Sequence, residues 1–176
     1  MFSIRKTRPA LLLAPLIAPL IVFAPTAAHA QSAERTFRGD LRDLAPTIPD
    51  AFEGASAKLT MDTRRGHTRF VLKVRGINLS IAEDAYGAHL HVGPCVAGQP
   101  AAALGHYNVS TANPPVVNSS TEVWLDFAVT DDGTAQSRAT VPWVPTPGDR
   151  SVVIHAEETN PDGTAGTRLA CLPVSW

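Results

Sequence analysis

The sequence has no excess of positive charge, few cysteines and no sustained helical pattern. Its 176 residues include 15 Lys or Arg and 16 Asp or Glu. Without the three basic residues among the first eight, the balance is 12 to 16, a net charge near −4. Such a chain lacks the overall positive charge of a nucleic-acid-binding protein. Its net negative charge also disfavours adhesion to anionic membranes. We therefore expect neither nucleic acid nor a membrane as a partner.

The N-terminal thirty residues have the pattern of a secretory signal peptide. Basic residues at 5–8 precede an apolar stretch at 9–24, and Ala28–Ala30 is a small-x-small cleavage site. Prolines interrupt the apolar stretch, which argues against a membrane-spanning helix. No cysteine follows it, so we expect no lipid anchor either. We expect cleavage near Ala30 and a secreted or periplasmic protein.

Cysteine occurs twice, as Cys95 and Cys171, and both residues lie in the part that we expect to be exported. An oxidising compartment favours their pairing, and two cysteines allow only one intramolecular bridge. In the chain-entropy model, a bridge closing a loop of this length stabilises the fold by about 4 kcal/mol. We interpret the two cysteines as a structural disulfide.

No segment has the period of an amphipathic helix, and a period of two prevails after residue 55. Residues 31–55 are polar and without a sustained period, so we interpret them as a loose N-terminal extension. Residues 56–176 are enough for one domain, and we find neither an internal repeat nor a second domain. Alternation and turn signals predict strands at 57–61, 68–77, 88–92, 122–130, 134–143, 150–158 and 167–176. Short strands at this spacing predict an all-β antiparallel sandwich or Greek-key barrel.

Two long connections, 93–121 and 157–167, interrupt this pattern. The first is rich in Gly, Pro, Ala, Asn and Ser. Long loops on a compact β domain are more often functional than not. We therefore expect the functional residues to lie in or beside them.

Five histidines follow the signal peptide, and four of them invite a functional interpretation. His89 and His91 are two apart on an expected strand, so both point to one face and can converge on a metal ion. His106 lies in the first long loop, and His155 ends an apolar strand. The alternatives are solvent-facing histidines for the first pair and a packed, hydrogen-bonded ring for His155. His67 lies in a basic turn, and we assign it to solvent.

Taken in order, four segments of residues 57–176 resemble the copper/zinc superoxide dismutase family. They are "HLH" at 89–91, "GHYN" at 105–108, "SVVIHAEE" at 151–158 and "GTAGTRLAC" at 163–171. The resemblance implies a Greek-key β-barrel and copper ligation by His89, His91, His106 and His155. It also implies that Arg168 guides the superoxide anion, and that Cys95 and Cys171 form the intrasubunit disulfide. The alternative for Arg168 is a surface arginine at the start of a strand.

The segment after His106 departs from the pattern of the two-metal enzymes. Residues 107–121 contain no His, Asp, Glu or Cys, and a closed zinc site requires four N, O or S ligands. The connection before Arg168 is also shorter than the family's charged loop. The chain therefore resembles the copper-only subgroup, and we expect one copper and no zinc per chain.

The resemblance implies conversion of superoxide to oxygen and hydrogen peroxide by copper. Two other functions remain open because fold does not fix function. One is a copper-sequestering or copper-delivering protein on the same scaffold, and the other is a degenerate domain that contacts a partner. The sequence does not indicate an oligomeric state.

Without zinc, the second ring nitrogen of His106 needs another partner, and metal-bound histidines usually have a carboxylate, carbonyl or water there. Glu122 and Asp126 are four residues apart on an expected strand and point the same way as Trp124, opposite an apolar face. We favour Glu122, which stands where the loop rejoins the strand, and expect it to orient His106 and assist proton delivery. The alternatives are Asp126, or two solvated carboxylates.

Overall fold

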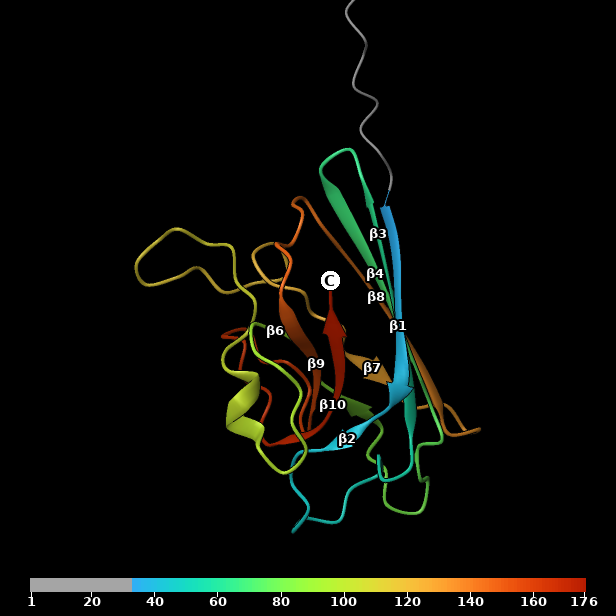
Figure 1. Ribbon diagram of the computed structural model, residues 1–176. Coiled ribbons are helices and arrows are strands. Elements are labelled where there is room, and N and C mark those ends of the chain that lie inside the picture. The colour runs from blue at the N-terminus through green and yellow to red at the C-terminus, as the bar shows by residue number, and fades with distance from the viewer. Residues whose placement is uncertain (1–32) are drawn as a thin grey trace, which may run out of the picture.

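The computed structural model describes residues 33–176, so the expected signal peptide and its cleavage site lie outside the described residues. Figure 1 shows two sheets facing each other, with long loops gathered at one side. One four-stranded sheet has the order β1 (Ala33–Asp40), β3 (Ser56–Arg64), β4 (His67–Arg75), β8 (Thr134–Val141). The other has the order β2 (Arg42–Asp43), β10 (Arg168–Ser175), β9 (Asp149–His155), β6 (Ala88–His91). A small pair, β5 (Ala85–Tyr86) and β7 (Phe127–Ala128), accompanies them.

All strand pairs of these sheets are antiparallel, which confirms the prediction of an all-β antiparallel sandwich. Within residues 33–176 no ladder joins the two four-stranded sheets, so they do not form a closed barrel. The described residues contain one short 3₁₀ helix, η1 (Pro100–Ala103), and no helix long and apolar enough to cross a membrane.

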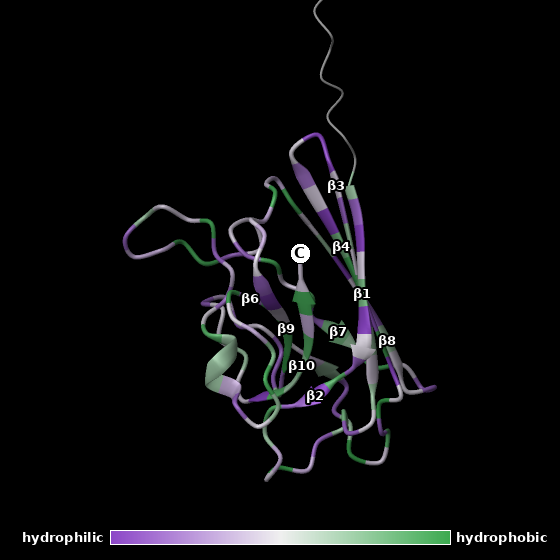
Figure 2. Cartoon of the chain, in the orientation of Figure 1, coloured by the Kyte–Doolittle hydropathy of each residue, from purple (hydrophilic) through white to green (hydrophobic). Residues whose placement is uncertain are grey.

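The core lies between the two sheets, as the period of two requires. Leu59, Phe70 and Leu72 from one sheet meet Ile154 and Leu172 from the other, and each is at most 1% exposed. Figure 2 shows hydrophilic and hydrophobic residues alternating along β3 and β4, because one face of that sheet meets solvent. β10, by contrast, is hydrophobic over most of its length and is covered on both faces.

The interpretation of residues 31–55 as a loose extension is wrong. Residues 33–40 form β1, which pairs with β3 along its whole length, and β2 pairs with β10. β1 gave no alternating apolar signal because it is an exposed edge strand. Its one large apolar residue, Phe37, packs on Trp176 with 5.9 Å between ring centroids.

The expected strand at 122–130 is only partly a strand. β7 covers residues 127–128, and the preceding part makes isolated bridges, one of them from Trp124 to His89. The apolar face was predicted correctly, because Val123 and Leu125 are fully buried. Glu122, on the opposite face, is also buried at 3% exposure, so the polar face here lies under a loop.

Candidate metal centre

Cys95 and Cys171 form the expected disulfide, with 5.7 Å between their Cα atoms. It ties the start of the long loop to β10, within a second buried cluster outside the main core. That cluster consists of Leu44, Cys95, Ala103, Val153 and Cys171. The long loop is therefore anchored against the outer side of the β6–β9–β10 sheet, and its path toward His106 starts from a fixed point.

The four histidines singled out from the sequence come together on this side of the sheet. His89 and His91 lie on β6 and His155 ends the adjacent β9. His106 reaches them because its loop returns along β6, where the amide of Tyr107 donates to the carbonyl of Leu90 at 2.7 Å. One nitrogen from each ring lies within 4.8 Å of those of the other three. His67 is exposed, as expected.

The ring nitrogen of each histidine that does not face the cluster is held by an acceptor. Nδ1 of His91 donates to the carbonyl of Leu104 at 3.2 Å, and Nδ1 of His155 to that of Gly166 at 3.3 Å. A carbonyl can only accept, so each of these rings carries its proton on Nδ1 and its lone pair on Nε2. The two Nε2 atoms lie 3.3 Å apart. Two lone pairs at that distance repel unless a cation or proton lies between them.

His89 is oriented the other way round, through Thr159. The Thr159 hydroxyl donates to Oδ1 of Asp126 at 2.7 Å, so its oxygen is free to accept from Nε2 of His89 at 2.6 Å. Nδ1 of His89 therefore carries the lone pair. This atom is fully buried and has no hydrogen-bond partner among the described residues. An unpaired buried nitrogen facing three other imidazoles is well suited to a metal ion.

His106 is held by Glu122. Its Nδ1 donates to Oε2 of Glu122 at 2.9 Å, which leaves Nε2 for the cluster. The same oxygen accepts from Nε1 of Trp124 at 2.9 Å, and Oε1 accepts from the side chain of Asn108 at 2.9 Å. Burial alone would raise the pKa of Glu122, but these three donors together hold it below its ordinary value. The carboxylate of Glu122 is thus charged and turned toward His106, the orientation favoured from the sequence. Asp126 instead acts on His89, through the hydroxyl of Thr159.

The loop at 157–167 covers this pair. Gly163 has φ +84°, and a Cβ there would lie 2.6 Å from the side chain of Val117. The same point is 3.8 Å from Oε2 of Glu122 and 3.9 Å from Nδ1 of His106. Glycine therefore lets the second long loop close over the first, directly above the His106–Glu122 contact.

Burial keeps His89, His91 and His155 neutral in the metal-free protein. Burial, and then repulsion from His106, lowers the pKa of His89 and of His91 to about 2. Burial also lowers the pKa of His155 to about 4. Neutral imidazoles are the form that binds metal ions. The site is closed except near His106, whose side chain is 17% exposed.

Arg168 begins β10 directly opposite His155 in the register. Its guanidinium donates to the carbonyl of Pro100 at 2.7 Å and to that of Leu104 at 2.6 Å. The Leu104 carbonyl also holds His91, so one acceptor fixes both the arginine and a histidine of the cluster. Partial burial lowers the pKa of Arg168 from a very high ordinary value. A fixed cation thus stands beside the cluster.

The set of donors fits one metal ion. Nδ1 of His89 and Nε2 of the other three rings present four lone pairs to one point. Metal–imidazole bonds of about 2 Å place opposite ligands about 4 Å apart, and the four ring nitrogens already lie within 4.8 Å of one another. Sequence reasoning missed Thr159, Asn108 and the two carbonyl acceptors. Thr159 lies in a loop whose path the sequence does not reveal.

Comparison with known proteins adds no assignment: no protein-family model matches the chain, and no curated protein matches it.

Proposed function

We propose that this protein is an exported copper-dependent superoxide dismutase that works without zinc and has the Greek-key topology of the copper/zinc family. The observation that carries the proposal is the convergence of four imidazoles, each with its outer nitrogen held by an acceptor. The order of the four segments along the sequence, with Cys95 between the first two, supports the same family.

Copper suits these residues better than other common metals. Imidazole binds copper in both oxidation states, and imidazole-rich tetragonal sites favour Cu(II). His89, His91, His106 and His155 would hold the ion. Bound copper would supply the one-electron chemistry, in which one superoxide is oxidised to oxygen and a second, with two protons, is reduced to hydrogen peroxide.

Zinc has no site beside His106 in this proposal. In the two-metal enzymes the second nitrogen of this ring bridges to zinc, but here Glu122 accepts from that nitrogen. Residues 107–121 offer none of the usual zinc ligands. Glu122 orients the ring instead, because it keeps the proton on Nδ1 of His106 and the lone pair on Nε2, and it assists proton delivery.

Arg168 distinguishes an enzyme from a copper carrier. A carrier has no need of a permanently charged donor anchored by two carbonyls beside its metal site. An enzyme acting on a small anion gains from one, because the charge attracts the substrate and orients it. The partly exposed guanidinium would hold superoxide on the side of the cluster that remains open.

The test is the decay of superoxide in the presence of the purified, copper-loaded protein without its signal peptide. We expect catalytic decay, lost in His106→Ala and kept in His67→Ala, which removes an exposed histidine away from the cluster. If the wild type binds one copper and superoxide decays no faster than in buffer, the protein is a copper-binding protein and the enzymatic proposal is wrong.

A further inference from the structure

The solvent face of the β1–β3–β4–β8 sheet carries half of the basic residues that follow the signal peptide. The register places Arg38, Lys58 and Lys73 side by side on three adjacent strands. Other cations lie on the same face at neighbouring positions, and all are exposed. Together they form what we name the basic sheet face: Arg38, Lys58, Arg69, Lys73, Arg75 and Arg138.

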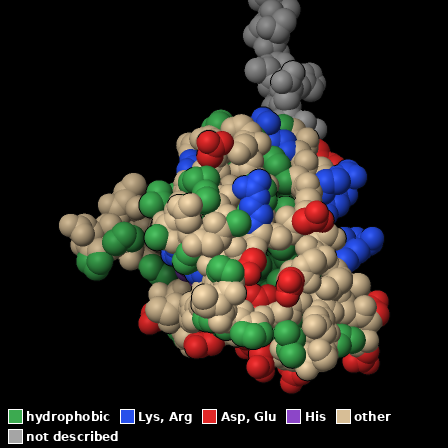
Figure 3. All heavy atoms as spheres, turned by 60° about the horizontal axis from the view of Figure 1, so that its bottom comes forward, with side chains coloured by type: hydrophobic (Ala, Val, Ile, Leu, Met, Phe, Trp, Pro, Cys, Tyr) green, Lys and Arg blue, Asp and Glu red, His purple; other side chains and the backbone are tan. Residues whose placement is uncertain are grey.

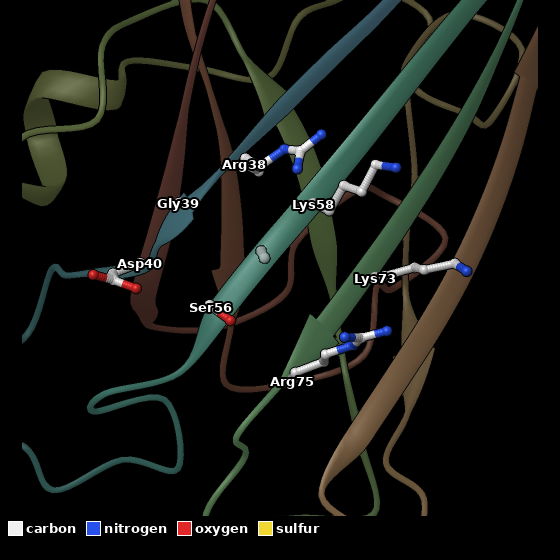
Figure 4. A pocket seen from close by; sticks show the side chains of 8 residues that line it. Arg38, Gly39, Asp40, Ser56, Lys58, Lys73 and Arg75 are labelled. Carbon is white, nitrogen blue, oxygen red and sulfur yellow. The ribbon is translucent and has the colours of Figure 1, made fainter.

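The side chains of this face line a continuous hollow. One part is bordered by Arg38, Lys58, Lys73 and Arg75, and an adjoining part by Arg69 and Arg138, with Lys58 and Lys73 common to both. Figure 4 shows the four cations of the first part projecting from their strands to the same side. Asp40 is the one carboxylate at the border of this hollow.

The central row of this face, Arg38, Lys58 and Lys73, has no carboxylate opposite it on the neighbouring strands, although Asp62 lies opposite Arg69 further along β4. Among residues 33–176, none of the six cations makes an ion pair, and the one surface ion pair nearby joins Asp62 to Arg64. Like charges directly opposite each other on neighbouring strands destabilise a sheet. A row of three in a protein that is acidic overall therefore costs stability, and a ligand of opposite charge would offset that cost.

The basic sheet face lies on the far side of the molecule from the histidine cluster. Its strands turn Leu59, Phe70 and Leu72 inward, and the cluster lies beyond the second sheet. In Figure 3, Asp and Glu dominate the end that comes forward, while Lys and Arg gather along the side formed by this sheet. A ligand on this face would leave Arg168 and His106 open to solvent.

We propose that the basic sheet face docks the protein on an acidic polysaccharide. The hollow suits a polymer chain, and a polymer with one carboxylate or sulfate per sugar repeats its charge at close to the strand spacing of about 4.8 Å. A lipid surface is disfavoured because none of the large exposed apolar residues lies on this face. Single-stranded nucleic acid is disfavoured because the face carries no aromatic residue for base stacking.

The experiment measures binding of the purified chain to immobilised dextran sulfate and polygalacturonate, with uncharged dextran as the reference. We expect binding to both acidic polymers that weakens steeply as salt is added, because exposed charges are screened. The double variant Lys58→Gln/Lys73→Gln should bind about tenfold more weakly or worse, since it removes the two cations that border both parts of the hollow.

The matched control is Arg35→Gln/Arg65→Gln, which changes net charge equally. Arg35 pairs with Met61 and so belongs to the other face of β1, and Arg65 lies in the turn after β3. The control should bind as the wild type does. The test variant should melt no lower than the wild type, because it removes a repulsion, and its copper content should be unchanged.

Four outcomes would overturn the proposal. They are no binding to either polymer, equal weakening in both double variants, binding only to vesicles of anionic lipid, and a salt-sensitive self-association that the test variant abolishes. The last outcome would mean that the basic sheet face binds the acidic end of a second copy of this protein. The test does not depend on enzymatic activity, so it stands or fails separately from the proposed function.

Discussion

The replacement Glu122→Gln tests how His106 is held. In the wild type, the two oxygens of Glu122 accept from three donors, on His106, Trp124 and Asn108. A glutamine has one acceptor oxygen and one donor amide, so at least one of these donors must face another donor. Glu122 is 3% exposed, and water cannot readily replace the lost acceptor. The unpaired group should cost about 1–3 kcal/mol of unfolding free energy.

The same replacement should weaken metal binding, because losing the partner of a metal-bound histidine typically costs about 10–100-fold in affinity or activity. We would measure urea unfolding of the metal-free protein and copper affinity by competition with a chelator. The control, Glu158→Gln, removes an exposed carboxylate of the covering loop that has no hydrogen bond to the cluster. If Glu122→Gln matches the wild type in both stability and affinity while Asp126→Asn does not, the role belongs to Asp126.

Three further predictions concern the disulfide, the buried rings and Arg168. Cys95→Ala/Cys171→Ala should lower the unfolding free energy by about 4 kcal/mol, measured in urea, and a loss under about 1 kcal/mol would contradict the structural role of the bridge. In the metal-free protein, burial above all lowers the pKa of His89 and His91 to about 2 and that of His155 to about 4. Below about pH 6.5 the unfolded chain therefore binds more protons than the folded protein. The free energy of unfolding should decrease as the pH is lowered, by about 2 kcal/mol per histidine between neutral pH and pH 5. Unfolding curves that coincide at pH 7.5 and about pH 5 would refute this burial. Arg168→Ala should keep copper bound but lower the rate with superoxide, and Arg168→Glu should lower it further; a full rate in Arg168→Glu would remove Arg168 from the site.

The sequence predicted the histidine cluster better than it predicted which strands form the edges of the sheets. The spacing of His89 and His91 predicted a shared face, and the structure confirms it together with the approach of His106 and His155. The pair was readable from its spacing on a strand, whereas His106 and His155 were joined to it only by the family resemblance. β1, in contrast, carries almost no apolar signal because it is an exposed edge strand held by backbone hydrogen bonds to β3.

The partners of the rings were only partly predictable. Glu122 could be singled out because a carboxylate stands where the loop rejoins the sheet. The carbonyls of Leu104 and Gly166 could not, since every residue has a carbonyl and only the folded loops decide which one faces a ring. Thr159 and the return of the long loop along β6 depend in the same way on tertiary structure.

The most direct test of the account is the metal content of the protein after reconstitution with copper and zinc together, in equal excess, followed by removal of loosely bound ions. The account predicts one copper and no stoichiometric zinc per chain, and loss of the copper in His89→Ala, which removes a buried ring nitrogen that has no partner among residues 33–176. A full equivalent of zinc beside the copper, or copper retained in full by His89→Ala, would contradict a four-histidine copper site.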